Sequence, residues 1–237
     1  MSYNQTPPPY FGGYSGITVT ESNAIMKRVY LRMFIGLLVS AFCALGVASS
    51  PTALSLFFGN SVMYILLFVA MIAMAWILPS RMSRMRSSTV LGLFILFSAM
   101  MGITLAPIFL VYNLGSIIST FFITAGTFGA MSVYGYFTKS DLSKISTYLI
   151  MALFGLIIAS LVNMFVANST LDWIISIVGV LVFVGLTAWD TQTIKRLAQT
   201  EMDPSMSDKL ATIGAMNLYL DFINMFLYLL RLLNSRD

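Results

Sequence analysis

The chain has 237 residues, of which 58% are hydrophobic and 9% charged, and its formal net charge is +4. Water-soluble domains carry about 25% charged residues, so this composition excludes an ordinary soluble protein and indicates one surrounded by a lipid bilayer. The basic residues are scattered between apolar runs, a pattern typical of loops beside a membrane, and we expect no nucleic-acid partner.

The chain contains no histidine. This excludes Ser-His and Cys-His nucleophiles, histidine zinc motifs and an imidazole pH switch, so a response to neutral pH would have to come from a carboxyl group. The single cysteine, Cys43, lies in an apolar run and cannot form an intramolecular disulfide. We expect neither an enzyme nor a bound cofactor.

Residues 1–26 are polar and rich in Pro, Gly and Tyr, which predicts a disordered cytoplasmic tail. Lys27 and Arg28 precede the first apolar run, which we interpret as an uncleaved span. Stretches without any charge leave room for one or two helices of about 20 residues each. Residues 27–237 are therefore predicted to form an all-α transmembrane domain with seven spans, near residues 29–49, 59–79, 89–110, 116–137, 146–167, 173–194 and 212–233.

The loops predict the orientation. Lysine and arginine occur in the tail and in the second, fourth and sixth connections, whereas residues 50–58, 111–115 and 168–172 contain neither. The positive-inside rule therefore places the N-terminus in the cytoplasm. Arg231 and Arg236 near the C-terminus conflict with seven complete spans, and a re-entrant last segment is the alternative.

Small residues and a proline indicate how the helices pack. In the fourth span, Ala125 and Gly129, and likewise Gly126 and Ala130, are small residues four apart, which favours close approach of a neighbouring helix or ordinary helix packing. Pro107, within the third span, predicts a kink.

Two aspartates lie where a membrane helix should not carry charge. Asp190 is near the cytoplasmic end of the sixth span, and Asp221 is near the middle of the last. Asn217, Asp221, Asn224 and Tyr228 recur at helical spacing and form one polar stripe. The stripe must face the protein interior or a water-filled path, so it serves either helix packing or passage of an ion.

Two carboxyl groups that meet at low dielectric cannot both ionise, so they share a proton and titrate as a coupled pair. Such a pair could hold a closed state and open when the proton leaves, and its oxygens suit a hard cation such as Ca²⁺. Arg81, Arg84 and Arg86 lie at about the depth of Asp190, where an Arg–Asp contact could latch the cytoplasmic mouth.

Several segments resemble the Bax inhibitor-1 family, also called the transmembrane Bax inhibitor motif family. The resemblance is carried by WDTQ at 189–192, NLYLDFINMF at 217–226, LLR at 229–231, MGITLAPIF at 101–109 and YGYFTKSDLS at 134–143. It runs from about residue 25 to the C-terminus and looks closest to the bacterial, inner-membrane branch.

The resemblance implies a seven-helix bundle whose last helix is central and wrapped by the other six. It also implies a pH-dependent calcium leak channel, with calcium as the permeant ion. By position, Asp190 and Asp221 would be the proton-sensing gate and transient calcium ligands. Asn217, Asn224 and Tyr228 would line the route.

The resemblance further implies an arginine latch near the second span. Counting back from Gly102 places it at Arg84, whereas counting forward from Trp76 places it just ahead of Arg81, which is therefore the alternative. Some relatives carry an acidic residue in the second helix that pairs with the position of Arg231, but residues 60–79 contain none here.

Other functions remain open. Some relatives restrain a membrane protease or modulate stress responses, so the chain could be a non-transporting regulator that binds a membrane protein through its tail. An intramembrane aspartyl protease also uses two aspartates, but residues 218–221 lack the glycines of that motif.

Overall fold

The structure is a computed structural model that describes residues 19–200 and 203–234. In these residues the chain forms helices joined by short turns, and no β-strand occurs among them. The elements follow in the order α1 (Val19–Ala48), α2 (Pro51–Phe58), α3 (Ser61–Arg81), η1 (Met82–Arg84), α4 (Ser87–Leu105), α5 (Ile108–Val111), α6 (Leu114–Phe137), α7 (Ser143–Val166), α8 (Ser169–Ala198) and α9 (Pro204–Asn234).

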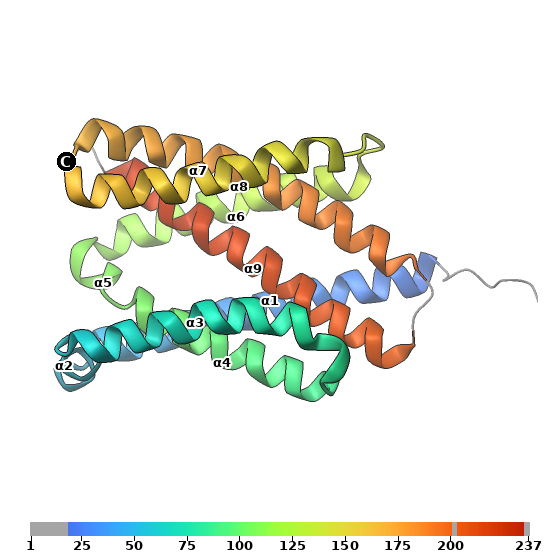
Figure 1. The fold of residues 1–237 in the computed structure, drawn as a ribbon, viewed down its shortest axis with the longest axis horizontal. Coiled ribbons are helices and arrows are strands. Elements are labelled where there is room, and N and C mark those ends of the chain that lie inside the picture. The colour runs from blue at the N-terminus through green and yellow to red at the C-terminus, as the bar shows by residue number, and fades with distance from the viewer. Residues whose placement is uncertain (1–18, 201–202, 235–237) are drawn as a thin grey trace, which may run out of the picture.

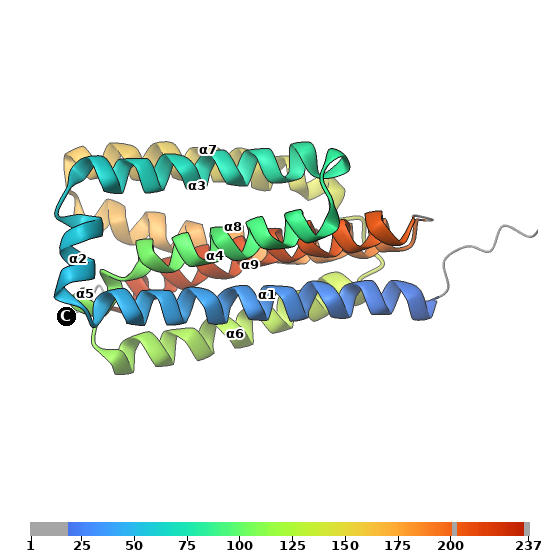
Figure 2. The same cartoon turned by 90° about the horizontal axis from the view of Figure 1, so that it is seen from below.

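In the described part of the chain, seven helices are long and apolar enough to cross a membrane: α1, α3, α4 continued by α5, α6, α7, α8 and α9. Successive spans run in opposite directions, so α1 begins at one end of the bundle and α9 ends at the other (Figure 1, Figure 2). We call these ends the N-terminal face and the C-terminal face. The predicted all-α fold with seven spans is confirmed.

The turns at the C-terminal face are capped by polar residues that already mark breaks in the sequence. The side chains of Ser50, Asn60, Asn113 and Asn168 each accept a hydrogen bond from a backbone N–H in the first turn of the next helix. Such caps satisfy donors that the helix leaves unpaired. α3, α6 and α8 therefore start within four residues of the predicted boundaries, whereas α2 lies in residues 50–58, which were expected to form a loop.

Two helices begin earlier than predicted, and one breaks. α1 starts at Val19 rather than near residue 29, so residues 19–26 of the expected tail are helical, while residues 1–18 lie outside the described chain. α9 likewise starts at Pro204 rather than near residue 212. Pro107 separates α4 from α5, so the expected kink is a break. The early turns of α1 are held by a buried stripe of Ser22, Ile25, Met26 and Val29.

The close approaches between helices occur at other glycines than predicted. A Cβ atom at Gly126 or Gly129, in the small-residue pairs of α6, would meet no other atom within 4 Å. At Gly102 it would overlap the backbone carbonyl oxygen of Ser40, so α4 and α1 touch backbone to backbone there. The close approach predicted at Gly126 and Gly129 is therefore not made within this structure.

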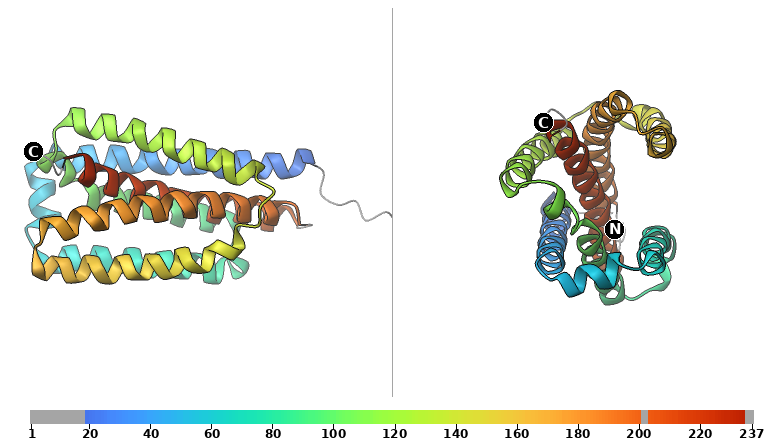
Figure 3. Two further views of the ribbon diagram at one scale, coloured as in Figure 1. Left: turned by 90° about the horizontal axis from the view of Figure 1, so that it is seen from above. Right: turned by 90° about the vertical axis from the view of Figure 1, so that its left-hand side faces the viewer.

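α9 is the most buried of the seven spans in the described chain. It packs most extensively against α8 and α1, and then against α6 and α4, as the end-on view of Figure 3 shows. α3 packs mainly on α4, and α7 mainly on α8. Four helices therefore make the main contacts of α9, fewer than the six that the family resemblance implies.

Candidate functional site

The polar stripe lies on the least buried side of α9. Asn217, Asn224 and Tyr228 are partly exposed, whereas most of this helix is buried. Asp221 belongs to the same stripe, but only 5% of it is exposed. About one helical turn separates Asp221 from each asparagine. The carboxyl group in the middle of α9 therefore has an amide on either side.

Two glycine contacts fix the register between α8 and α9. Gly214 of α9 lies against the side chain of Ile194 on α8, and Gly179 of α8 lies against the ring of Tyr228 on α9. Because the two helices are antiparallel, these contacts place Asp190 level with Asn217, and Asp221 level with Thr187. The two aspartates are therefore offset by about one helical turn, roughly 5 Å along the axis.

The two aspartates interact electrostatically, but no hydrogen bond joins them within the described residues. The charge of Asp190 acts on the carboxyl group of Asp221. Oδ2 of Asp221 is buried and has no hydrogen-bond partner among the described residues. An ionised carboxylate without a partner at this depth costs several kcal/mol. A proton or a cation is therefore the natural partner for this oxygen.

The arginines expected to latch the site lie elsewhere. Arg84 is in the short η1 helix at the N-terminal face, and Arg81 ends α3. Both are exposed, and among the described residues neither forms an ion pair with an aspartate. The predicted contact with Asp190 is thus not made in this structure, because η1 keeps both side chains at the surface.

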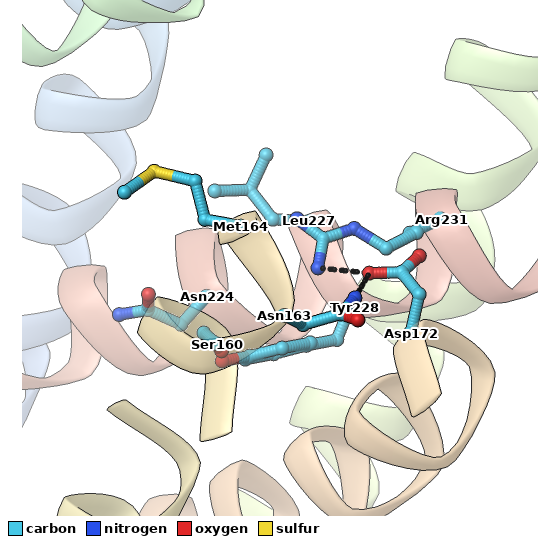
Figure 4. Close-up of a pocket in the computed structure, with 8 residues that line it drawn as sticks. All are labelled: Ser160, Asn163, Met164, Asp172, Asn224, Leu227, Tyr228 and Arg231. Atoms are coloured by element: carbon cyan, nitrogen blue, oxygen red, sulfur yellow. Dashed lines mark hydrogen bonds and ion pairs between the residues drawn. The ribbon is translucent and has the colours of Figure 1, made fainter. Parts of the chain in front are cut away.

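Toward the C-terminal face, the polar stripe of α9 opens into a cavity of about 380 Å³ between α7, α8 and α9 (Figure 4). Its walls combine the stripe with polar side chains of α7 and α8: Ser160, Asn163, Met164, Asp172, Asn224, Leu227, Tyr228 and Arg231. Asn224 lies about one turn from Asp221. The cavity therefore ends about one helical turn from the buried carboxyl group, which is not part of its lining.

An ion pair crosses this cavity. The Arg231 guanidinium donates to Oδ1 of Asp172 at 3.2 Å, and Asn163 Nδ2 lies 3.5 Å from the same oxygen (Figure 4). Asp172 of α8 thus supplies the acidic partner of Arg231 that residues 60–79 do not contain. It also explains how Arg231 can lie near the C-terminal face, because its charge is neutralised there.

A second ion pair anchors the other end of α9, and sequence analysis missed it. Arg32 on α1 donates to the Asp208 carboxylate and, at 2.7 Å, to the hydroxyl of Thr212. Arg28 lies 3.9 Å from the same carboxylate. The available signal was the spacing of Arg28 and Arg32, four residues apart and so on one face of the first helix.

Comparison with known proteins identifies the family. The family model described as "Inhibitor of apoptosis-promoting Bax1" matches residues 22–237. The chain belongs to this family. This Bax inhibitor family protein is 46% identical over 213 residues to the inner membrane protein YbhL of Escherichia coli, with 89% of this chain and 91% of the relative covered.

Two further relatives of this family protein are uncharacterized proteins. The one from Borreliella burgdorferi is 44% identical over 215 residues, covering 90% of this chain and 93% of the relative. The one from Deinococcus radiodurans is 36% identical over 220 residues, covering 93% and 94%. The predicted resemblance to the Bax inhibitor family is thus confirmed, and the family model covers all seven spans of this chain from residue 22 onward.

Within the part of this Bax inhibitor family protein that the structure describes, the acidic residues do not gather into a metal cluster. Among the described residues there is no group of three or more His, Cys, Asp or Glu side chains that could hold a metal ion. Asp190 and Asp221 together supply two carboxyl groups, whereas Ca²⁺ takes six to eight oxygen ligands. A calcium ion at this site would need most of its ligands from water or neutral oxygens.

Proposed function

We propose that the protein is a pH-sensitive calcium leak channel whose gate is the pair Asp190 and Asp221. The observation that carries this proposal is the buried Asp221 carboxyl, which has an oxygen without a hydrogen-bond partner among the described residues and lies on a stripe that leads into a polar cavity. A helix used only for packing gains nothing from such a group. A few loosely placed oxygen ligands suit a cation in transit better than one held permanently.

The gate would work through a shared proton. When the pair holds a proton, one aspartate can donate a hydrogen bond to the other and keep α8 against α9. When the proton leaves at higher pH, two negative charges about one turn apart repel each other and attract a divalent cation. Flux is therefore expected to rise as pH rises through the titration of the pair.

Arg84 is proposed as the latch of the closed state, with Arg81 as the alternative. Both are exposed at the N-terminal face and free of ion pairs with the described aspartates, so either can move without breaking such a contact. A bond from one of them to Asp190 would close the N-terminal mouth of the route. Asn217, on the turn between that mouth and Asp221, would line it.

The proposed location is the cell inner membrane, with the N-terminus in the cytoplasm. The similar Escherichia coli protein is described as an inner membrane protein. The turns at the N-terminal face contain arginines and lysines, as cytoplasmic loops do. In this orientation the cavity at Asp172 and Arg231 opens on the opposite side of the membrane.

The test is calcium flux into liposomes that contain the purified protein and a trapped calcium dye, at pH about 6 and about 8. Wild-type protein should conduct more at the higher pH. Asp190→Asn combined with Asp221→Asn should abolish this pH dependence, because no carboxyl group remains to share the proton. Asp203→Asn is the matched control, since this exposed aspartate before α9 can be replaced by another good capping residue.

An alternative function is a non-transporting regulator that binds a membrane protease or another stress-response partner. It is favoured by α3 and α7, which are the least buried spans in the described chain and turn most side chains outward, where another helix could pack. The same experiment separates the two functions. No calcium flux at either pH, from protein that is folded in the liposomes, would support the regulator and contradict the channel.

A further inference from the structure

The turn between α6 and α7 forms several hydrogen bonds with the C-terminal turns of α8, close to Asp190. We propose that residues 136–143, together with Gln192, Lys195 and Arg196, form a clasp, and that Gln192 is the positioning residue through which the clasp sets the place of Asp190. This inference rests on the proposed function for its importance, but its structural part can be tested without any measurement of flux.

Gln192 is bound at both ends of its amide group. Only 5% of this residue is exposed. Its Oε1 accepts a hydrogen bond from the backbone N–H of Leu142 at 3.0 Å, and its Nε2 donates to the carbonyl oxygen of Ser140 at 2.8 Å. One side chain of α8 therefore supplies partners for two backbone groups of the turn. An apolar side chain at this position would leave the buried N–H of Leu142 unpaired.

Two cations on the next turn of α8 extend the clasp. Lys195 donates from Nζ to the carbonyl oxygen of Tyr136 at 2.6 Å and lies 4.2 Å above the ring of the same tyrosine. Arg196 donates to Oδ1 of Asp141 at 2.8 Å and to Oγ of Ser143 at 3.1 Å. Both are charge-assisted contacts, and together with Gln192 they fix the last turns of α8 against a single short segment.

The geometry of the helix links the clasp to Asp190. Ala188 and Gln192 are four residues apart and share one side of α8. On this side Gly135 of α6 lies against the backbone carbonyl of Ala188, so closely that a Cβ atom at Gly135 would overlap it. Asp190 lies between them in sequence and thus about 200° around the axis from each, on the side toward α9. Rotation of this segment to move Asp190 would therefore break the bonds of Gln192.

The clasp stays closed over the pH range in which the gate is proposed to respond. The hydrogen bond from Arg196 holds the pKa of Asp141 below its usual value of 3.8, with further help from Ser143. Because this pKa is lowered on folding, the contact contributes fully at neutral pH and is lost only as pH falls through the lowered value. The clasp therefore positions Asp190, the proposed pH sensor, but does not itself respond to pH in the neutral range.

The experiment compares wild-type protein with Gln192→Leu, which keeps the volume of the side chain and removes both hydrogen bonds. Gln199→Leu is the matched control, since Gln199 is exposed at the end of the same helix. Hydrogen exchange of the Leu142 amide should be about fivefold faster in Gln192→Leu and unchanged in the control. Labelling of Asp190 by a hydrophobic carbodiimide should change in rate by about threefold, again only in Gln192→Leu.

The pH profile of calcium flux is the third readout, and its midpoint should shift by about half a unit in Gln192→Leu. The positioning role is overturned if Leu142 exchanges faster while the carbodiimide rate and the midpoint both stay at wild-type values. If Asp190→Asn leaves flux unchanged but Gln192→Leu alters the labelling of Asp190, the clasp is supported and the proposed gate fails.

A second variant keeps the inference testable if Gln192→Leu does not fold. Asp141→Asn removes the surface ion pair with Arg196 and leaves the buried bonds of Gln192 in place. It should change the labelling rate of Asp190 in the same direction as Gln192→Leu does, by a smaller factor. An unchanged rate in this variant overturns the clasp as a unit, because the ion pair of Arg196 would then have no part in placing Asp190.

Discussion

At the scale of single residues, the two ends of α9 are held by ion pairs that differ in burial. The side chains of Arg231 and Asp172 are 42% and 35% exposed, whereas those of Arg32 and Asp208 are 14% and 29% exposed. We predict that Asp208→Ala destabilises the protein by about 3 kcal/mol, because it leaves the Arg32 guanidinium buried without a counter-charge. Asp172→Ala should cost less than about 1 kcal/mol, since solvent screens that pair.

Thermal unfolding in detergent measures this order. Replacing both partners, with Arg32→Met and Asp208→Leu together, should recover much of the stability lost in Asp208→Ala, because no unpaired charge then remains. Equal losses in Asp208→Ala and Asp172→Ala would contradict the burial argument.

The same residues show what could be read from the sequence. Asp221 stands out because a charge in the middle of an apolar run is costly wherever the helix packs. Asp172 and Asp208 do not, because they lie near the ends of spans, where charge is ordinary, and their partners are far away in sequence. Pairing between distant residues depends on which helices become neighbours, and a single sequence does not contain that information.

At the scale of helices, glycines decide where two backbones touch. We predict opposite effects of the same substitution at two positions. Gly126→Ala should be neutral or stabilising by up to about 1 kcal/mol, because alanine favours helix and a Cβ there meets open space. Gly102→Ala should destabilise by about 1–3 kcal/mol, because its Cβ overlaps the backbone of α1 at Ser40 and the helices must separate.

Unfolding midpoints of the two variants in one detergent test this contrast. A stabilised Gly102→Ala would show that α1 and α4 are not in backbone contact. Sequence analysis identified the spans, because long runs without charge mark them. It mistook the contact surface of α6, because spacing groups residues on one side of a helix without saying what that side faces. It also missed the start of α1, where the exposed polar residues Glu21 and Asn23 alternate in sequence with residues of the buried stripe.

At the scale of the whole molecule, the start of α1 and the end of α9 lie at opposite faces of the bundle, as an odd number of spans requires. The charges of Arg231 and Arg236 suggested a re-entrant last segment. The charge of Arg231 is paired with Asp172, and Arg236 lies outside the described residues. α9 is also long enough to cross, at 31 residues, or about 46 Å at 1.5 Å per residue. The clasp and the Arg32 pair lie toward one face, and the polar cavity lies toward the other, with the aspartates between them.

We therefore predict that alkaline phosphatase, which is active only outside the cytoplasm, is active when fused after Asp237 and inactive when fused after Gln199. The second fusion is the matched control, because Gln199 follows α8 at the same face as the start of α1. A green fluorescent protein fused at the same two positions should show the reverse pattern, since it matures in the cytoplasm. If both fusions after Asp237 report the cytoplasm, the last helix turns back within the membrane, and the cavity at Asp172 cannot be the outer entrance to the site.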